Sequence, residues 1–359
     1  MTPIPDLGRG VNFGGWISQA PNDEDHRRSF VTQSDFRRIA DWGFDNVRLP
    51  FDHPLLCPTD DLDNCNEAGF AWLDTAFAWA EEAGLKLILD MHSLPGFTFM
   101  DPINNPNGVS SLFTEKRLQD VYFGLWQTIA RRYAGRFPAV VFELANEIVA
   151  PDPQLWNDLA AGAVRAIREV EPERPIVVGS NCWNVCGTFS DLAPVDDPNI
   201  IYNFHFYNPF TFTHQRASWS PEMVFYDRAV KYPGNAPGMR EAAARARDDG
   251  KEWVAKQLES LAGFFEDRVS DQTHLEELMQ PSFTFAKAHG VPLYCGEFGA
   301  ISHAGLEDRL NWFRDVLTIF RRHNVAWSLW SYKGMAFGVV DGKGNVISEE
   351  MLNLLRGVE

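Results

Sequence analysis

A chain of 359 residues with 45% hydrophobic and 23% charged residues has the composition of an ordinary soluble globular protein with a large core. Its formal net charge of −17 at pH 7 argues against binding to nucleic acids or to anionic membranes, because both are polyanions. No apolar stretch of the sequence approaches the ~20 residues of a membrane-spanning helix.

The N-terminus and the cysteines bear on compartment and metal binding. The first residues, Met1–Asp6, have neither the basic nor the apolar region of a signal peptide, so we expect a cytoplasmic protein, or a secreted one if a leader has been removed. Five cysteines are an odd and sparse number, which predicts free thiols, although Cys57 could pair with Cys65 and Cys182 with Cys186. Neither pair has the spacing and the histidine partners of a zinc site, and we expect no metal and no cofactor.

Apolar runs alternate with helical patterns along the chain. In chain order, the runs that predict strands are Val11–Trp16, Asn46–Leu49, Leu85–Met91, Val140–Ala145, Ile176–Gly179, Ile200–Phe206, Val291–Cys295 and Val325–Trp330. Apolar residues at three- and four-residue spacing predict helices at Phe70–Ala83, Arg117–Tyr133, Leu155–Val170, Phe283–His289 and Leu306–Arg322. This alternation predicts an α/β fold, a (β/α)8 TIM barrel that forms a single domain over residues 1–359.

The stretch 209–273, between the sixth strand and its helix, breaks the alternation. It holds aromatic residues early, then Tyr232-Pro233-Gly234, then a charged helical segment from about Met239. A structureless loop of this length is uncommon in a compact domain. We therefore expect a small helical subdomain, inserted after strand six over the mouth of the barrel.

Polar and aromatic residues gather where the predicted strands end. In barrels of this kind the active site lies at the carboxyl ends of the strands, where the loops to the helices converge. The residues at these ends are Trp16, Arg48, His92, Asn146, Glu147, His205, Tyr207, Glu297 and Trp330. Taken singly, each has a structural explanation: Arg48 as an ion-pair partner, His92 or His205 as a core histidine, Trp330 as a packing residue.

Two of these residues are glutamates 150 positions apart, Glu147 and Glu297, each at the end of a strand-like run. Hydrolysis of a glycosidic bond needs two carboxyl groups, one as proton donor and one as nucleophile or base. Arg48 and Tyr207 could favour the ionised form of Glu297, whose negative charge would help Glu147 keep its proton. Asn146 could bind a sugar hydroxyl, and Trp330 offers a flat face to a pyranose ring.

Longer motifs carry a specific resemblance. Asn146-Glu147 and Glu297 look like the signature of glycoside hydrolase family 5, in the large retaining clan A. Several longer motifs resemble the clostridial endoglucanase C type of that family, namely Gly14–Gln19, Val47–Asp52, Leu89–His92, Tyr202–Phe210, Phe212–Gln215, Trp219-Ser220, Lys231–Gly234 and Tyr294–Gly299. The match runs from about Gly10 to Leu355 and includes the insertion. Ile148 departs from the broad family, in which proline commonly follows the acid/base, but the closer relatives also carry an aliphatic residue there.

The resemblance implies a retaining endo-β-glucanase, without a signal peptide, that acts on β-1,4 or mixed β-1,3/1,4 glucans. By correspondence Glu147 is the acid/base and Glu297 the nucleophile. The residues implied around them are Arg48, His92, Asn146, His205, Tyr207 and Trp330. The segments Cys57–Cys65 and Asn181–Gly187 match no pattern of the family, which leaves the substrate preference open. We expect a monomer that binds a β-glucan and neither nucleic acid nor a membrane.

Three other functions remain open at this point. An exo-acting β-glucosidase or β-1,3-glucanase would use the same catalytic residues, with the inserted subdomain closing one end of the cleft. A non-catalytic carbohydrate-binding barrel would be expected to have lost a catalytic carboxylate, and both are present. A metal-dependent barrel hydrolase would be expected to carry His-x-His on the first strand or an HExxH motif, and the sequence has neither.

Overall fold

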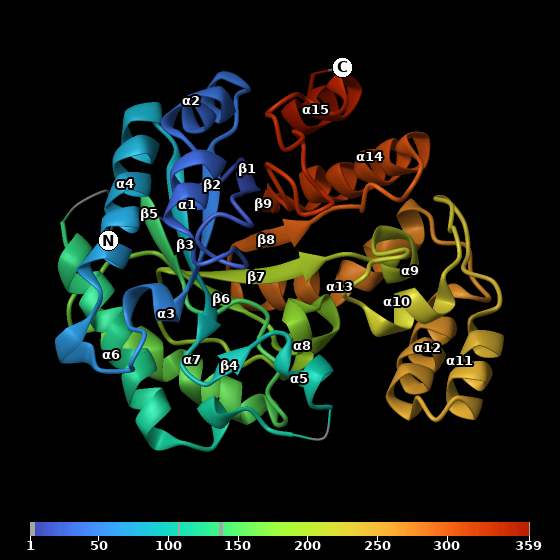
Figure 1. Cartoon of the computed structure of the whole chain (residues 1–359), viewed down its shortest axis with the longest axis horizontal. Helices are drawn as coiled ribbons and strands as arrows, with labels where there is room; N and C mark the ends of the chain where they lie inside the picture. The colour runs from blue at the N-terminus through green and yellow to red at the C-terminus, as the bar shows by residue number, and fades with distance from the viewer. Residues whose placement is uncertain (1–3, 107, 136–138, 359) are drawn as a thin grey trace. The chain divides into compact units, whose positions relative to one another are not determined.

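The computed structural model describes residues 4–358 except 107 and 136–138. Eight parallel strands form a closed barrel with helices around it, as predicted (Figure 1). Their order around the barrel is β2-β1-β9-β8-β7-β6-β5-β3, and a further pairing of β2 with β3 closes the ring. The short strand β4, Phe97–Thr98, adds an antiparallel hairpin to β3.

Internal contacts divide the chain into two compact units. The first contains the residues up to 205 together with 281–296 and 325–332, and the second contains 206–280, 297–324 and the residues from 333 onward. The strand registers that build the barrel, such as Val47 opposite Leu87, lie in the first unit. Among the described residues no helix has both the length and the apolar composition that a membrane span requires.

Each predicted run overlaps one barrel strand. The strands are β1 Arg9–Asn12, β2 Asn46–Asp52, β3 Lys86–Leu94, β5 Val140–Glu143, β6 Ile176–Gly179, β7 Ile200–Phe206, β8 Leu293–Phe298 and β9 Ala326–Leu329. The first differs most from its prediction, because β1 ends at Asn12 rather than at Trp16. The chain turns away from the barrel just beyond, where Gly15 has φ 79°, a conformation that glycine adopts without steric cost.

The longer helices begin and end at residues suited to those positions. In the first unit they are α1 Glu24–Phe30, α2 Gln33–Asp41, α4 Glu67–Ala83, α6 Lys116–Tyr133 and α7 Pro153–Arg168, with short α3 His53–Leu56, α5 Asp101–Asn104 and α8 Asn181–Asn184. The side chain of Asn66 accepts a hydrogen bond from the N–H of Ala68 at the start of α4, and Gly84 ends that helix in the left-handed conformation. Asp152 caps α7 in the same way, with Pro153 in the first turn.

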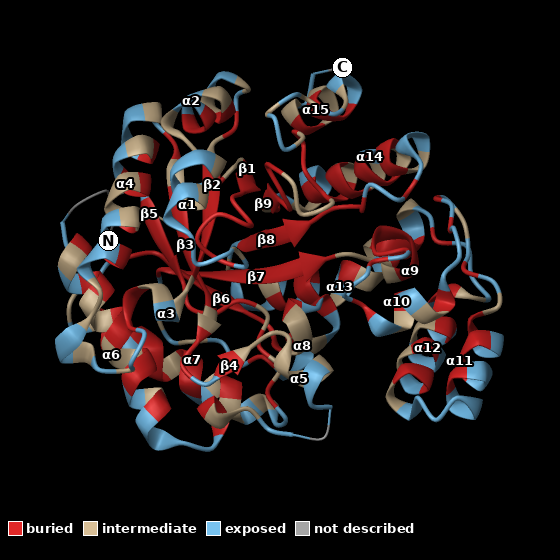
Figure 2. Cartoon of the chain, in the orientation of Figure 1, coloured by how far each residue is buried: buried red, intermediate tan, exposed pale blue. Residues whose placement is uncertain are grey.

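The barrel interior is layered, because side chains along a strand alternate between its two faces. One layer is a hydrophobic cluster formed by Leu7, Ile88, Val141, Val177, Ile201 and Tyr294. Two residues further along the strands, the side chains are polar: Asp90 follows Ile88, Glu143 follows Val141 and Asn203 follows Ile201. All three polar residues are fully buried, and the strands are buried along their lengths (Figure 2).

The second unit is mainly helical. It contains α9 Phe210–Thr213, α10 Pro221–Tyr226, α11 Met239–Asp248, α12 Glu252–Phe265, α14 Leu306–His323 and α15 Glu349–Arg356, while α13 Gln272–His289 is shared by both units. Helices α11 and α12 lie side by side in Figure 1. The insertion is hydrogen-bonded to α14, because the buried Tyr232 donates to Asp315 Oδ2 at 2.6 Å. A helical insertion at this place agrees with the prediction, although its independence as a subdomain stays a proposal.

Candidate active site

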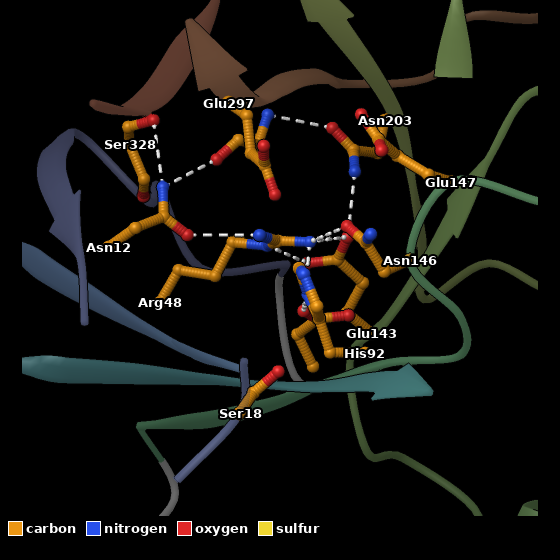
Figure 3. Close-up of polar contacts among 12 residues, drawn as sticks. Asn12, Ser18, Arg48, His92, Glu143, Asn146, Glu147, Asn203, Glu297 and Ser328 are labelled. Carbon is orange, nitrogen blue, oxygen red and sulfur yellow. Dashed lines mark hydrogen bonds and ion pairs between the residues drawn. The ribbon is translucent and has the colours of Figure 1, made fainter. Parts of the chain in front are cut away.

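Arg48 is the centre of the polar layer in the barrel (Figure 3). Its guanidinium, which is fully buried, donates to both oxygens of Glu143 at 2.7 and 2.9 Å, and an Asp90 oxygen lies 3.0 Å away. It also donates to Asn12 Oδ1 and to Asn146 Oδ1, both at 2.9 Å. A planar fork with five donors suits this task, since each hydrogen bond to a charged or amide oxygen fixes a neighbouring strand.

Asn146 is held by this network in a way that leaves one of its groups available. Its Oδ1 accepts from Arg48, whereas its Nδ2 is buried and has no hydrogen-bond partner in the described part of the chain. A buried donor without a partner costs about 1–3 kcal/mol, so such a group is typically kept for a ligand or a water. This arrangement suits the predicted contact with a sugar hydroxyl, which stays a prediction.

Glu147 follows Asn146 with φ 45°, a left-handed conformation that is uncommon for a residue with a side chain. Its Oε1 lies 2.9 Å from His205 Nδ1, and its side chain is 14% exposed, so the carboxyl group remains accessible. Burial, followed by the positive charge of Arg48 and the electrostatic effect of His92, holds the pKa of His205 well below its usual range. His205 is therefore neutral near pH 7, so its contact with Glu147 is a hydrogen bond rather than an ion pair.

Glu297 belongs to the second unit, where its surroundings differ from those of Glu147. The hydroxyl of Tyr207 donates to Glu297 Oε2 at 2.8 Å. The ring of Tyr207 makes edge contacts with His214 at 4.9 Å and with Phe337 at 6.0 Å between centroids. Trp219, which is 42% exposed, contacts both His214 and Phe337. An aromatic wall from the inserted segment therefore continues from the tyrosine that holds this glutamate.

Trp330 and His92 form a stacked pair in the first unit, with ring centroids 5.8 Å apart and an interplanar angle of 7°. His92 Nδ1 lies 2.7 Å from Asp90 Oδ2, which fixes the orientation of its ring. Gly14 leaves room for the indole of Trp330, because a Cβ at position 14 would lie 2.7 Å from the Trp330 ring. The indole, which is only 6% exposed, is thus held in one orientation, and its expected contact with a sugar ring stays a prediction.

Trp16 does not occupy the place that the sequence suggested for it. It is fully buried, stacks on Trp79 at 6.0 Å, and donates its indole N–H to the carbonyl of Arg27 at 2.8 Å. We therefore correct its expected role from substrate contact to core packing. The reason is that β1 ends four residues earlier than predicted, which carries Trp16 past the barrel opening and into the contact with α2 and α4.

Sequence reasoning missed four residues of the polar layer: Asn12, Asp90, Glu143 and Asn203. They lie within or at the end of the strands and before the loops, whereas site residues were expected only at the strand ends that lead into the loops. A signal was present, because Asp90 and His92, like Asn203 and His205, are two residues apart and so share one face of a strand. A charged residue such as Glu143 inside an otherwise apolar run is a second signal.

The acidic and histidine side chains of the first unit suit proton transfer better than metal binding. Asp90 and Glu143 are both paired with the guanidinium of Arg48, at 3.0 and 2.7 Å. Glu147 and His205 are residue types that bind zinc, but they are hydrogen-bonded to each other. None of the five cysteines, all of which lie in the described residues, forms a disulfide, and Cys57, Cys186 and Cys295 are buried.

Comparison with known proteins agrees with this arrangement. A family model described as cellulase (glycosyl hydrolase family 5) matches residues 9–336. Endoglucanase C of Acetivibrio thermocellus is 36% identical over 347 residues, which cover 96% of this chain and 97% of that protein. Cellodextrinase A of Ruminococcus flavefaciens is 33% identical over 321 residues, covering 89% and 83% of the two chains.

Solved structures resemble the chain over nearly its whole length. Thermotoga maritima Cel5A in complex with cellobiose aligns with a TM-score of 0.75 at 25% identity, over 98% of this chain and 97% of that one. The resemblance inferred from short motifs is therefore confirmed by sequence and by fold.

Proposed function

The chain belongs to glycosyl hydrolase family 5, and on that premise we propose that it is an endo-β-glucanase that cleaves β-1,4 or mixed β-1,3/1,4 glucans with retention of configuration. The observation that carries the proposal is that two glutamates at the ends of barrel strands are held by different donors. A neutral imidazole faces Glu147, and a phenol faces Glu297. Two carboxyl groups in different surroundings can take different roles.

In this mechanism Glu297 attacks the anomeric carbon and forms a glycosyl-enzyme intermediate. The hydroxyl of Tyr207 donates a hydrogen bond to this carboxylate and so orients it. Glu147 gives its proton to the departing glycosidic oxygen, and in the second step it takes a proton from the water that releases the sugar. Asn146, with an unpartnered buried N–H, is suited to bind a hydroxyl of the sugar under attack.

A retaining mechanism makes a geometric prediction. The carboxyl groups of Glu147 and Glu297 should lie about 5–5.5 Å apart in a crystal structure with a bound oligosaccharide, and a separation of about 9 Å would instead indicate inversion.

Azide rescue tests the two roles directly. Glu297→Ala should abolish turnover of a β-configured substrate, and azide should restore it with an α-glycosyl azide as product. Glu147→Ala should give a β-glycosyl azide and should lose least activity on substrates with good leaving groups, which need no proton. Identical behaviour of the two variants toward every leaving group would refute the division of roles.

The inserted segment is proposed to shape substrate preference. Its early aromatic residues lead from Tyr207, which binds Glu297, through His214 to the half-exposed Trp219. An exposed indole in contact with the rings that pack on Tyr207 is suited to bind a sugar ring, whereas a purely structural cap would not need Trp219 exposed.

Product analysis separates the remaining functions. Chromatography of products from cellulose derivatives, lichenan, laminarin and short cello-oligosaccharides should show internal cleavage of β-1,4-containing chains. Release of glucose alone, or activity on laminarin alone, would favour the exo-acting or β-1,3-specific alternative. A carbohydrate-binding protein would release nothing, and a metal-dependent hydrolase would lose activity with a chelator, which we expect to have no effect. We also expect a monomer, which light scattering can test.

A further inference from the structure

The ring of His205 has hydrogen-bonding neighbours on both of its nitrogens. Nδ1 lies 2.9 Å from Glu147 Oε1. On the other side, Nε2 lies 3.4 Å from the amide nitrogen of Asn184 and 3.5 Å from that of Asn203. A neutral imidazole carries its hydrogen on only one nitrogen, so these neighbours decide which one it is.

The orientation of Asn203 settles the choice, because both ends of its amide have other partners. Its Oδ1 accepts a hydrogen bond from the N–H of Gly296 at 2.7 Å, and its Nδ2 donates to Glu143 Oε1 at 2.8 Å. The amide therefore cannot be turned over without breaking both bonds. Its NH2 group faces Nε2, which must be the acceptor, and the hydrogen of His205 is on Nδ1.

Asn184 presents a second amide nitrogen to Nε2, at 3.4 Å, while its Oδ1 is buried without a hydrogen-bond partner in the described residues, so Asn203 is the residue that fixes the assignment. The backbone is unusual at Asn184. Cys182, Trp183 and Asn184 are consecutive residues with positive φ, of 52°, 60° and 57°. Such a run is costly and persists where surrounding contacts determine it, often at functional sites. The carbonyl of Ile148, next to Glu147, accepts the N–H of Trp183 at 3.1 Å, which ties this strained turn to the acid/base segment.

Two glycines make room for these amides. A Cβ at Gly179 would lie 2.6 Å from Asn184 Oδ1, and a Cβ at Gly296 would lie 2.8 Å from Asn203 Nδ2 and 3.1 Å from His205 Nε2. Real side chains do not approach so closely, so a larger residue at either position would displace an amide. Asn184, Asn203 and His205 are each at most 3% exposed, which keeps water from replacing them.

We propose that Asn184 and Asn203 are positioning residues that hold His205 as the Nδ1–H tautomer, so that it donates to Oε1 of Glu147 and directs the catalytic proton to Oε2. The inference rests on the proposed acid/base role of Glu147. In the first step Oε2–H passes its proton to the glycosidic oxygen as the bond from that oxygen to the anomeric carbon breaks and the bond from Glu297 forms. The hydrogen bond from His205 then meets a charged carboxylate and strengthens, which favours the transition state.

The charged groups around His205 support a neutral ring. Burial, and after it the electrostatic effects of Arg48 on β2 and His92 on β3, keep its pKa well below the usual range, while Glu147 accepts its N–H. Asn203 also donates to Glu143 on β5, which is paired with Arg48.

The tautomer can be observed without any assumption about catalysis. Long-range 1H–15N correlation on protein labelled at histidine, with His205 assigned by its loss in His205→Gln, should show a protonated Nδ1 and an unprotonated Nε2 at pH 7. Protonation at Nε2 in the wild type would overturn the inference. The proposed acid/base role of Glu147 is tested separately, by the azide products of Glu147→Ala.

Variants at a distance from Glu147 test the consequence for catalysis. Asn184→Leu and Gly179→Ala should lower kcat roughly tenfold on substrates with poor leaving groups, a fraction of the 10²–10⁴ that general acid catalysis contributes, with little effect on dinitrophenyl glycosides. Asn184→Asp should attract a hydrogen to Nε2 and add an ionisation to the pH profile of kcat that the wild type lacks.

Asn199→Leu is the matched control, because Asn199 is a buried asparagine just before β7, the strand that carries Asn203 and His205. Its side-chain NH2 group donates to the carbonyl of Glu173, and its backbone N–H donates to Asp197. This variant should change stability without changing the dependence on leaving group. If Asn184→Leu and Gly179→Ala behave like this control, Asn184 has a structural role only and the inference fails for it. Should both variants fail to fold, the wild-type tautomer still decides.

Discussion

The barrel interior and the inserted helices use charged residues in opposite ways. In the barrel, Arg48, Asp90 and Glu143 are fully removed from solvent and bind one another. In the insertion, ion pairs such as Arg240 with Asp267 lie at the surface, while alanines and other apolar residues of α11 and α12 form the buried side. Buried charges are expensive to desolvate, so a barrel that keeps them gains something other than stability.

What it gains is placement of functional groups. Three branches of the Arg48 network lead toward proposed site residues: to Asn146 directly, to His92 through Asp90, and to His205 through Glu143 and Asn203. A charge network inside a barrel can thus hold side chains from several strands at fixed orientations before substrate binds. The insertion has no comparable buried network among its described residues.

The largest difference between the two regions should appear on removal of one barrel charge. Glu143→Gln leaves Arg48 buried beside Asp90 without its bidentate partner, and breaking a buried pair in this way costs about 3–5 kcal/mol. Urea unfolding should show this loss, accompanied by loss of activity as Asn146 and Asn203 lose their fixed positions. If Glu143→Gln unfolds at the same urea concentration as the wild type, the network is not the structural element we describe.

A buried histidine of the second unit should make stability depend on pH. His214 stacks on Phe210 at 4.2 Å, and burial lowers its pKa from 6.5 to about 3. The unfolded chain therefore binds a proton that the folded one does not. The stabilising contribution is complete above about pH 6.5 and is lost progressively as the pH falls toward about 3, at up to about 1.4 kcal/mol per pH unit.

The thermal midpoint measured between pH 7.5 and pH 4.5 should fall more steeply for the wild type than for His214→Phe, which keeps the ring contact without the titration. Replacement of the exposed His303 by glutamine is the control and should leave the slope unchanged. Parallel slopes for the wild type and His214→Phe would show that His214 is protonated without cost in the folded state.

A smaller effect on activity is expected from Trp219, the exposed residue among the aromatic side chains that lead away from Tyr207. Trp219→Ala should raise KM for the longer glucans about five- to tenfold, since an aromatic contact is worth about 1 kcal/mol, and should leave thermal stability nearly unchanged. Val224→Ala, a truncation of another exposed apolar residue on the insertion, is the control. Unchanged KM values on all glucans would show that the aromatic residues of the insertion have a structural role only. That result would contradict their proposed role in substrate specificity.

The fold could be predicted from the sequence because alternating strands and helices leave few arrangements, and each apolar run overlaps one barrel strand. The candidate catalytic residues could be predicted because strand ends are where barrels carry them. The polar layer was missed because the role of Glu143 or Asn203 depends on which strand lies beside it. No local sequence pattern indicates that neighbour. The role of Asn184 is still harder to predict, because no sequence signal indicates three consecutive left-handed residues without a glycine. The prediction for Trp16 was wrong for a local reason, because the chain turns early, at Gly15.

The smallest effect should come from the surface charges of the insertion. Arg240 donates to both Glu266 and Asp267, and its side chain is 53% exposed. Water solvates both partners almost as well as they solvate each other, and salt screens the attraction, so exposed pairs typically contribute little. Arg240→Ala should therefore unfold at a urea concentration indistinguishable from the wild type in 0.5 M salt and at most slightly lower without salt. A large loss that persists in high salt would show that Glu266, which also accepts the backbone N–H groups of Gly238 and Arg240, needs this guanidinium to hold the start of α11 in place.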